Sequence, residues 1–429
     1  MTIDIRVDLP DKIRPMIFYT LDILRRHFDF NYQRVEVDAT LTISDRKESD
    51  ICIAKTFVQA VQTDSFRWQD LMTDGPIIRT EEGKPDYLST CFYMINCLQD
   101  HDTEDVADHL GRFPYVKSYQ HAFNCIEQNL VLQYLEDLVE SVPAFRNVKR
   151  RNIASRIFIS HDIDSLLKGI WPELKTAVRK TNLGTVLRLL FIEIWKNQDL
   201  KLFNRILSIN NEFDVRATFF WMVSHKGFDS PAGKVDNANY RIDGSYAQRM
   251  VNFLENNGQH IGLHKSISET SFEQEKRLLK RNVYVNRNHY LHGNIFETWR
   301  RLEHAQFQVD CSLGFAEVMG FRNSYGFPFY PYDLQEGTKA QILEVPLHIM
   351  DATFMYRDAV EPHIALERIS SFLEGHREHC ILSLLWHNNY FSEVAFSKWI
   401  DVYKEVLAFA LESDIRPIHN EELMGVFND

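Results

Sequence analysis

The sequence predicts an α/β protein in which a distorted (β/α) barrel of about seven parallel strands follows a smaller α/β domain. From residue 151 onward, short apolar runs alternate with amphipathic helical patterns. Nearly all of these runs end in aspartate, histidine or arginine. The chain has 429 residues, which is enough for more than one core. We therefore predict an N-terminal domain over residues 1–150 and a barrel over residues 151–429.

The N-terminal residues predict a small α/β unit. Residues 13–28 have the apolar periodicity of a helix, and residues 39–45 and 50–55 have the composition of short strands. Residues 76–150 are mixed, with helices predicted at 87–100 and 129–142. No motif in this region indicates chemistry. It is either one domain of 150 residues or a unit over residues 1–75 followed by a helical connector.

The predicted barrel begins with the run "RIFISHDID". Strands that alternate with helices at this spacing form βαβ units, which build a parallel sheet. Helices cover both faces of such a sheet, which explains apolar runs without strict alternation. Strands are predicted at 156–164, 214–223, 259–266, 282–291, 307–314, 342–351 and 380–389, and helices at 246–258, 270–282, 294–305, 363–376 and 397–413.

Composition excludes several classes of function. The net charge is −12 and there is no basic cluster, so a nucleic-acid partner is not expected. The N-terminus has no signal-peptide pattern, and no apolar run is long enough for a membrane span. The six cysteines include no CxxC pair, which favours free thiols and a cytoplasmic location. P-loop and G-x-S-x-G motifs are absent from the sequence.

Polar side chains at the ends of the predicted strands are the candidate functional residues. In a (β/α) barrel the carboxyl ends of the strands form the rim where active sites are built. Aspartate and histidine from separate strands suit a divalent metal with open coordination positions, and a further carboxylate and imidazole could serve as base and acid. The residues at these ends are Asp162, Asp164, His264, Arg287, His289, Asp310, His348, Asp351 and His387.

From about residue 155 to 425 the sequence resembles the polysaccharide deacetylases, carbohydrate esterase family 4. The resemblance is carried by five ordered motifs: "HDID" at 161–164, "RATFFWMV" at 216–223, "GQHIGLHKS" at 258–266, "RNHY" at 287–290 and "LLWHN" at 384–388. The N-terminal 150 residues lie outside the minimal domain of that family, as expected for a divergent bacterial subgroup with an extra N-terminal domain.

The resemblance implies a role for each matched residue. Asp162 would be the general base, and Asp164 and His264 would be metal ligands. Arg287 would orient the base, and the backbone N–H of Tyr290 would help to hold the oxyanion. His387 would protonate the leaving amine.

The second metal-binding motif departs from the family pattern. The family has His-Ser/Thr-x-x-His, whereas Ser268 stands here at the position of the second histidine. His260 cannot replace it, because side chains four residues apart on a strand are about 13 Å apart. His289 stands where the family has proline and is our candidate for the third ligand, although substrate contact or packing would also explain it.

The predicted activity is hydrolysis of an N-acetyl group on an amino sugar of a glycan or glycan precursor. The reaction is hydrolysis of a C–N bond other than a peptide bond. The expected cofactor is a divalent metal ion, with zinc as the first candidate. The alternatives are a non-catalytic glycan-binding or scaffold relative and a C–N hydrolase of another small amide. Candidate substrate contacts are Asp310, His348 and Trp386, although sheet-edge hydrogen bonds would explain Asp310, His348 and Asp351 equally well. The aromatic stretch at 325–333 is either a wall for sugar stacking or a packed loop.

Overall fold

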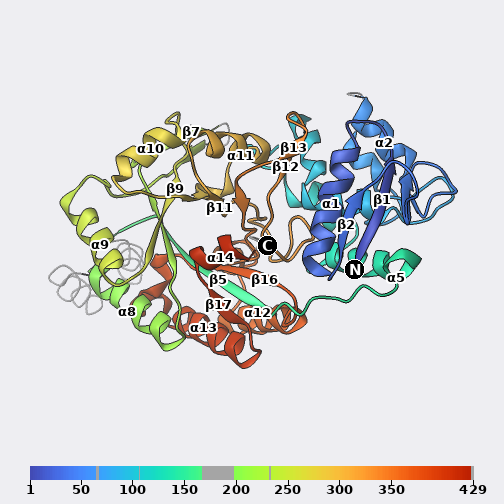
Figure 1. Cartoon of the computed structure of the whole chain (residues 1–429). Coiled ribbons are helices and arrows are strands. Elements are labelled where there is room, and N and C mark those ends of the chain that lie inside the picture. Colours follow the sequence, from blue (N-terminus) through green and yellow to red (C-terminus); the bar gives the residue numbers. More distant parts are fainter. Residues whose placement is uncertain (64–66, 106, 167–197, 231–232, 427–429) are drawn as a thin grey trace.

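The N-terminal part of the chain contains a small parallel sheet, seen at the right of Figure 1 in a computed structural model. The structure describes residues 1–63, 67–105, 107–166, 198–230 and 233–426. The sheet has the strand order β2-β1-β3-β4. Its strands are β1 (Thr2–Asp8), β2 (Asn31–Arg34), β3 (Leu41–Ser44) and β4 (Ile51–Cys52). Alternating burial of Ile3 and Ile5 in β1 places the apolar side of this strand in the core.

Helices of the N-terminal part pack against this sheet and against one another. Helix α1 has a proline in its first turn, where the missing N–H costs nothing, and Arg25, Arg26 and His27 in its last turn. The α-helices are α1 (Arg14–His27), α2 (Lys55–Gln62), α3 (Tyr87–Ile95), α4 (Tyr119–Ala122) and α5 (Leu130–Ser141). Short 3-10 helices are η1 (Trp68–Leu71), η2 (Leu98–Asp105), η3 (Tyr115–Lys117) and η4 (Pro143–Phe145).

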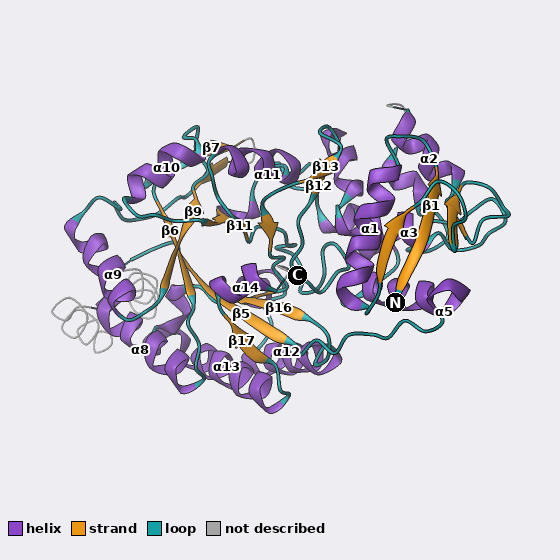
Figure 2. Cartoon of the chain, in the orientation of Figure 1, coloured by secondary structure: helices purple, strands orange, loops and turns teal. Residues whose placement is uncertain are grey.

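The second sheet has nine strands and forms the barrel, with helices on its outside (Figure 2). The strand order is β14-β11-β10-β9-β6-β5-β16-β15, and β17 also pairs with β5. All of these pairings are parallel, which confirms the predicted α/β barrel. The strands are β5 (Arg156–Ile163), β6 (Thr218–Met222), β9 (His260–Lys265), β10 (Val285–Asn288), β11 (Val309–Asp310), β14 (Leu343–Glu344), β15 (Ile349–Met350), β16 (Ile381–Leu385) and β17 (Arg416–Ile418).

The barrel is distorted where strands β11, β14 and β15 are only two residues long. The run 342–351, which the sequence predicts as one strand, is divided into β14 and β15 around Pro346. Proline has no N–H to donate to a neighbouring strand, which interrupts the ladder. Between the two strands, Val345 and Leu347 donate backbone hydrogen bonds to Asp310 and Leu313, so this segment still contacts β11.

In the described part of the chain, further helical segments follow the strands of the barrel. The α-helices are α8 (Gln198–Glu212), α9 (Ser245–Asn256), α10 (Phe272–Leu279), α11 (Ile295–His304), α12 (Pro362–Gly375), α13 (Glu393–Glu412) and α14 (Asn420–Gly425), and η6 (Thr353–Arg357) is a π-helix. Short 3-10 helices are η5 (His289–Leu291) and η7 (Asn388–Phe391), and small hairpins are β7–β8 (Phe228–Ser230, Gly233–Val235) and β12–β13 (Tyr332–Asp333, Thr338–Lys339).

The segment from 312 to 342 leaves the barrel between β11 and β14 and packs against the N-terminal part. Its side chains Tyr325, Phe327 and Phe329 are fully buried, so the aromatic stretch is a packed loop. Tyr19 in α1 donates a hydrogen bond to the carbonyl oxygen of Tyr330, at 2.9 Å. The two sheets therefore share one continuous hydrophobic core, and the division of the chain at residue 150 stays a prediction.

Buried polar contacts also join the two parts. The His27 ring lies 2.9 Å from the ring nitrogen of His379 and 2.7 Å from the hydroxyl of Tyr325. Burial lowers the pKa of His27 well below its usual value and that of His379 to about 4, which keeps both rings neutral. An ion pair of 2.6 Å between Arg322 and Asp100 is buried at the same interface.

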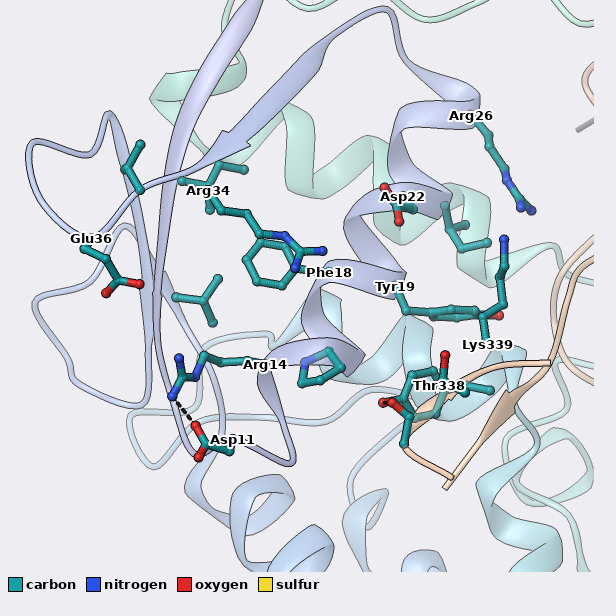
Figure 3. A pocket seen from close by; sticks show the side chains of 17 residues that line it. Asp11, Arg14, Phe18, Tyr19, Asp22, Arg26, Arg34, Glu36, Thr338 and Lys339 are labelled. Carbon is teal, nitrogen blue, oxygen red and sulfur yellow. Dashed lines mark hydrogen bonds and ion pairs between the residues drawn. The ribbon is translucent and has the colours of Figure 1, made fainter. Parts of the chain in front are cut away.

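A cavity of about 520 Å³ lies between α1, β1 and the β12–β13 hairpin (Figure 3). The Arg34 guanidinium stacks over the Phe18 ring on one side, 3.8 Å from its centroid. Arg14 pairs with Asp11 at the base, and Lys339 reaches in from the hairpin. In the described part of the chain, no helix is both long enough and apolar enough to cross a membrane.

Candidate metal centre and catalytic site

Asp164, His264 and His289 form a cluster at the carboxyl ends of three strands of the barrel, β5, β9 and β10. Asp164 directly follows β5, His264 lies in β9, and His289 directly follows β10. One donor atom from each residue lies within 4.8 Å of the other two. The Asp164 Oδ1 atom is 3.3 Å from Nε2 of His264 and 3.7 Å from Nε2 of His289. Two ligands at about 2.1 Å from a tetrahedral zinc ion are separated by about 3.4 Å, so the spacing fits a metal.

The hydrogen bond of His264 and the burial of His289 suit metal ligation. Against the effect of burial, the carboxylates of Asp162 and Asp164 raise the pKa of His264 when no cation lies between them. Nδ1 of His264 donates to the carbonyl oxygen of Arg287 at 3.0 Å, which leaves the Nε2 lone pair directed at Asp164. Burial lowers the pKa of His289 to about 3, so its ring is neutral. Among the described residues, Asp164 Oδ1 and His264 Nε2 are buried without a hydrogen-bond partner. Orphaned buried polar atoms are costly, and a cation between these two atoms would satisfy both.

Asp162 lies beside this cluster and is held by Arg287. Its Oδ1 accepts from the Arg287 guanidinium at 3.0 Å, and its Oδ2 is 3.6 Å from Nε2 of His264. Arg287 is fully buried, and it also donates to Ser160 Oγ at 2.8 Å and to the carbonyl oxygen of Cys311 at 3.0 Å. These contacts restrain the guanidinium, which in turn orients the Asp162 carboxylate.

His387 stands on the other side of the cluster and is paired with Asp351. Nδ1 of His387 is 2.6 Å from Asp351 Oδ1, and its backbone N–H donates to Asp351 Oδ2 at 2.5 Å. Its Nε2 is 3.6 Å from Asp164 Oδ2. Burial lowers the pKa of His387, but the carboxylates of Asp351, Asp164 and Asp162 together outweigh burial and raise it to about 10. The imidazole is therefore protonated at neutral pH and can donate a proton.

These residues line a cavity of about 520 Å³. Tyr290 and Tyr356 are exposed in its wall, with exposed fractions of 48% and 67%. Aromatic faces of this kind suit the apolar faces of sugars. The other lining residues include Arg112, Asp236, Asn237, Arg357, Asn389 and Tyr390.

Three of the predicted substrate contacts do not occur among the described residues that line the cavity. Asp310 is buried beside Glu344, where burial raises the pKa of both carboxyls, and it accepts from Asn286 at 2.8 Å. The His348 ring accepts from the backbone of Ser383 at 3.1 Å. Trp386 is fully buried. Their role in substrate binding stays a prediction without support from the cavity.

The remaining candidates have structural partners. Ser268 donates to Glu275 at 2.9 Å in a buried network with Lys265. His260 is the first residue of β9, at the end of the strand away from the cluster, and it lies 3.2 Å from Glu421 in α14. His161 donates from Nδ1 to the Trp386 carbonyl oxygen at 2.7 Å, and burial lowers its pKa to about 4. Neither the serine nor these two histidines takes part in the cluster.

Two site features escaped the sequence analysis. The pairing of Asp351 with His387 could have been suspected, because both follow neighbouring strands, β15 and β16. Arg112 in the cavity wall gave no signal, since it lies far from every strand of the barrel in sequence.

One family model matches the N-terminal part of the chain. Residues 8–145 match the model of DUF7033, a family of unknown function. No curated protein matches the sequence. A Mycobacterium smegmatis protein assigned as a polysaccharide deacetylase is 16% identical with a TM-score of 0.39, over 64% of this chain and 91% of that one.

Two further solved structures are similar at the same level. A Bacillus cereus polysaccharide deacetylase is 10% identical with a TM-score of 0.31, over 62% of this chain and 93% of that one. A Bacillus anthracis pseudoenzyme of carbohydrate esterase family 4 is 14% identical with a TM-score of 0.28, over 64% and 66%. Scores this low do not transfer an activity, so the function of this chain must be inferred from its own site.

Proposed function

We propose that the chain is a metal-dependent deacetylase that hydrolyses the N-acetyl group of an amino sugar in a glycan or glycan precursor. One observation carries the proposal. A cluster of one carboxylate and two histidines lies beside a clamped carboxylate, Asp162, and a protonated imidazole, His387. A base, an acid and three metal ligands are what amide hydrolysis at a metal requires.

Asp164, His264 and His289 are suited to hold the metal. Two imidazole nitrogens and one carboxylate oxygen, with further positions open, match the ligand set of catalytic zinc sites. The bound metal would supply Lewis-acid polarisation of the acetyl carbonyl.

The other steps fall to residues of the chain. Asp162 takes a proton from the attacking water, and Arg287 keeps its carboxylate directed at the cluster. The N–H of Tyr290 is a donor for the oxygen that becomes negatively charged at the acetyl carbon. His387 then gives its proton to the amine nitrogen as the C–N bond breaks. Acetate and the free amino sugar are the products.

The test combines metal analysis with acetate release from a panel of N-acetylated sugars. We expect about one zinc ion per chain, acetate release by the wild type, and loss of both in Asp164→Ala. Asp162→Asn and His387→Ala should keep the metal and lose about 10²–10⁴-fold in kcat, which is what one acid or base contributes. Full activity in Asp164→Ala, or wild-type protein without stoichiometric metal, would contradict the proposal. Turnover of another amide without release of acetate would favour a different C–N hydrolase.

A further inference from the structure

Residues 108–112 of the N-terminal part contact the turn that carries His289 and Tyr290. Arg112 donates from Nη1 to the carbonyl oxygen of Tyr290 at 2.9 Å. The backbone N–H of Gly293 donates to the carbonyl oxygen of Leu110, also at 2.9 Å. The Arg112 side chain is only 7% exposed, and it belongs to the wall of the catalytic cavity. The DUF7033-like region therefore reaches the catalytic site directly.

The turn itself has a strained backbone. Tyr290 has φ 56° and ψ 14°, and Leu291 has φ 55°, so two consecutive residues with side chains are left-handed. Such residues rarely adopt this conformation, and it persists only where the surroundings hold it in place. The same turn sets the directions of the His289 ring and of the Tyr290 N–H.

Arg112 is itself held in place by Asp108. Its Nε donates to Asp108 Oδ2 at 2.8 Å, and its Nη2 lies 2.7 Å from the same oxygen. Asp108 Oδ1 accepts from the backbone N–H groups of Leu110 and Arg112, at 2.9 and 3.0 Å. Gly111 and Gly293 face each other at the contact, with φ of 73° and 94°. The positive φ of both residues favours glycine, whereas a Cβ on Gly111 would make only ordinary van der Waals contact, 3.6 Å, with the Gly293 Cα.

We propose that Arg112 is a positioning residue of the active site. By binding the carbonyl oxygen of Tyr290, it fixes the strained turn so that the His289 ring meets Asp164 and the Tyr290 N–H faces the substrate. The N-terminal part thereby belongs to the catalytic unit. This inference rests on the proposed function for the role of the turn, whereas the contact between Arg112 and the turn does not depend on it.

The experiment compares Arg112→Ala and Arg112→Lys with the wild type and with Arg79→Ala. Arg79 is the matched control, because it is an exposed arginine of the N-terminal part that donates to a turn carbonyl, that of Gly83, outside the cavity. The first readout is hydrogen exchange of residues 286–296 in metal-free protein. The others are the zinc dissociation constant and the separate values of kcat and KM.

For Arg112→Ala we expect at least about tenfold faster exchange in the turn. Zinc affinity and kcat should each fall about 10–100-fold, the usual effect of removing a group that orients a metal ligand, with KM changed much less. In each readout, Arg112→Lys should give a value between those of the wild type and Arg112→Ala. Lysine keeps the positive charge but lacks the guanidinium fork that binds Asp108 and Tyr290 together. Arg79→Ala should match the wild type in every readout.

Unchanged exchange in the turn for either Arg112 variant would overturn the inference. If Arg112→Ala does not fold, Arg112→Lys decides the matter by the same measurement. A wild-type protein that releases no acetate would refute the proposed function alone, since the exchange readout needs neither metal nor substrate.

Discussion

Asp351→Asn should move the alkaline limit of activity down by more than three pH units. The Asp351 carboxylate and its hydrogen bond are the largest of the effects that hold the pKa of His387 at about 10 against burial, with Asp164 and Asp162 as the smaller ones. Asparagine keeps the size of the side chain but removes the charge. The pKa of His387 should then fall to about its ordinary value of 6.5, because burial opposes the effect of the two remaining carboxylates.

The size of the effect depends strongly on pH. At pH 8.5 a group with pKa 10 is almost fully protonated, whereas one with pKa 6.5 is about 1% protonated. Activity that needs the protonated ring should therefore fall about 100-fold at pH 8.5. At pH 5.5 the same change in pKa removes only about 10% of the protonated form. The ratio of variant to wild-type activity should rise steadily as the pH is lowered.

The assay is the pH profile of kcat from pH 5 to 10 for acetate release. Asp86→Asn is a matched control, since Asp86 is a buried carboxylate that caps α3 in the N-terminal part, and asparagine is also a good cap. Its profile should coincide with that of the wild type. An Asp351→Asn profile that is lowered equally at all pH values would refute the reasoning, because the loss would then not come from deprotonation of His387.

Three further predictions concern the metal and the interface. His289→Ala should weaken zinc binding by at least about tenfold in a competition titration, whereas Ser268→Ala should leave it unchanged; equal effects would contradict our ligand set. The neutral His27–His379 pair should make the free energy of unfolding fall as the pH is lowered from 6.5 towards 4, because the unfolded chain then binds more protons than the folded one. Denaturant titrations should show a flatter pH dependence in the His27→Gln/His379→Gln double variant, and parallel curves would refute this. Gly320→Ala should cost about 3 kcal/mol or more of stability, since Gly320 has φ 133° and a Cβ would overlap a backbone carbonyl of the N-terminal part; a loss below about 1 kcal/mol would show that the interface yields.

The barrel was predictable because its physical signals are local. Apolar runs and helical periodicity lie within single segments. Parallel strands bring their carboxyl ends to one edge of the sheet regardless of the length and conformation of the loops. For that reason the polar residues at the strand ends could be expected at one site, and the family resemblance selected Asp164 and His264 from among them, with His289 as the candidate for the third ligand. The cluster in the structure has this composition, and its metal remains to be measured.

The rest of the site depends on contacts between distant segments. Asp310, His348 and Asp351 lie in or next to two-residue strands, and no sequence pattern distinguishes their roles. The structure does so through pairing: Asp310 contacts Asn286, His348 contacts Ser383, and Asp351 alone reaches His387.

The contact of Arg112 with Tyr290 escaped prediction for a similar reason. Arg112 and Tyr290 are 178 residues apart in sequence. No periodicity or motif spacing encodes a contact over such a separation.

The contacts between the N-terminal part and later segments, including residues 312–342, also determine when the N-terminal part can finish folding during synthesis. Tyr19 can form its hydrogen bond only after Tyr330 has been synthesised, 311 residues later, and His27 can contact His379 only 352 residues later. During synthesis the N-terminal part therefore emerges long before the residues that complete its core exist. Chains dominated by such long-range contacts fold slowly and expose apolar surface meanwhile. A ribosome-bound intermediate should accordingly need protection by chaperones until almost the whole barrel has been translated.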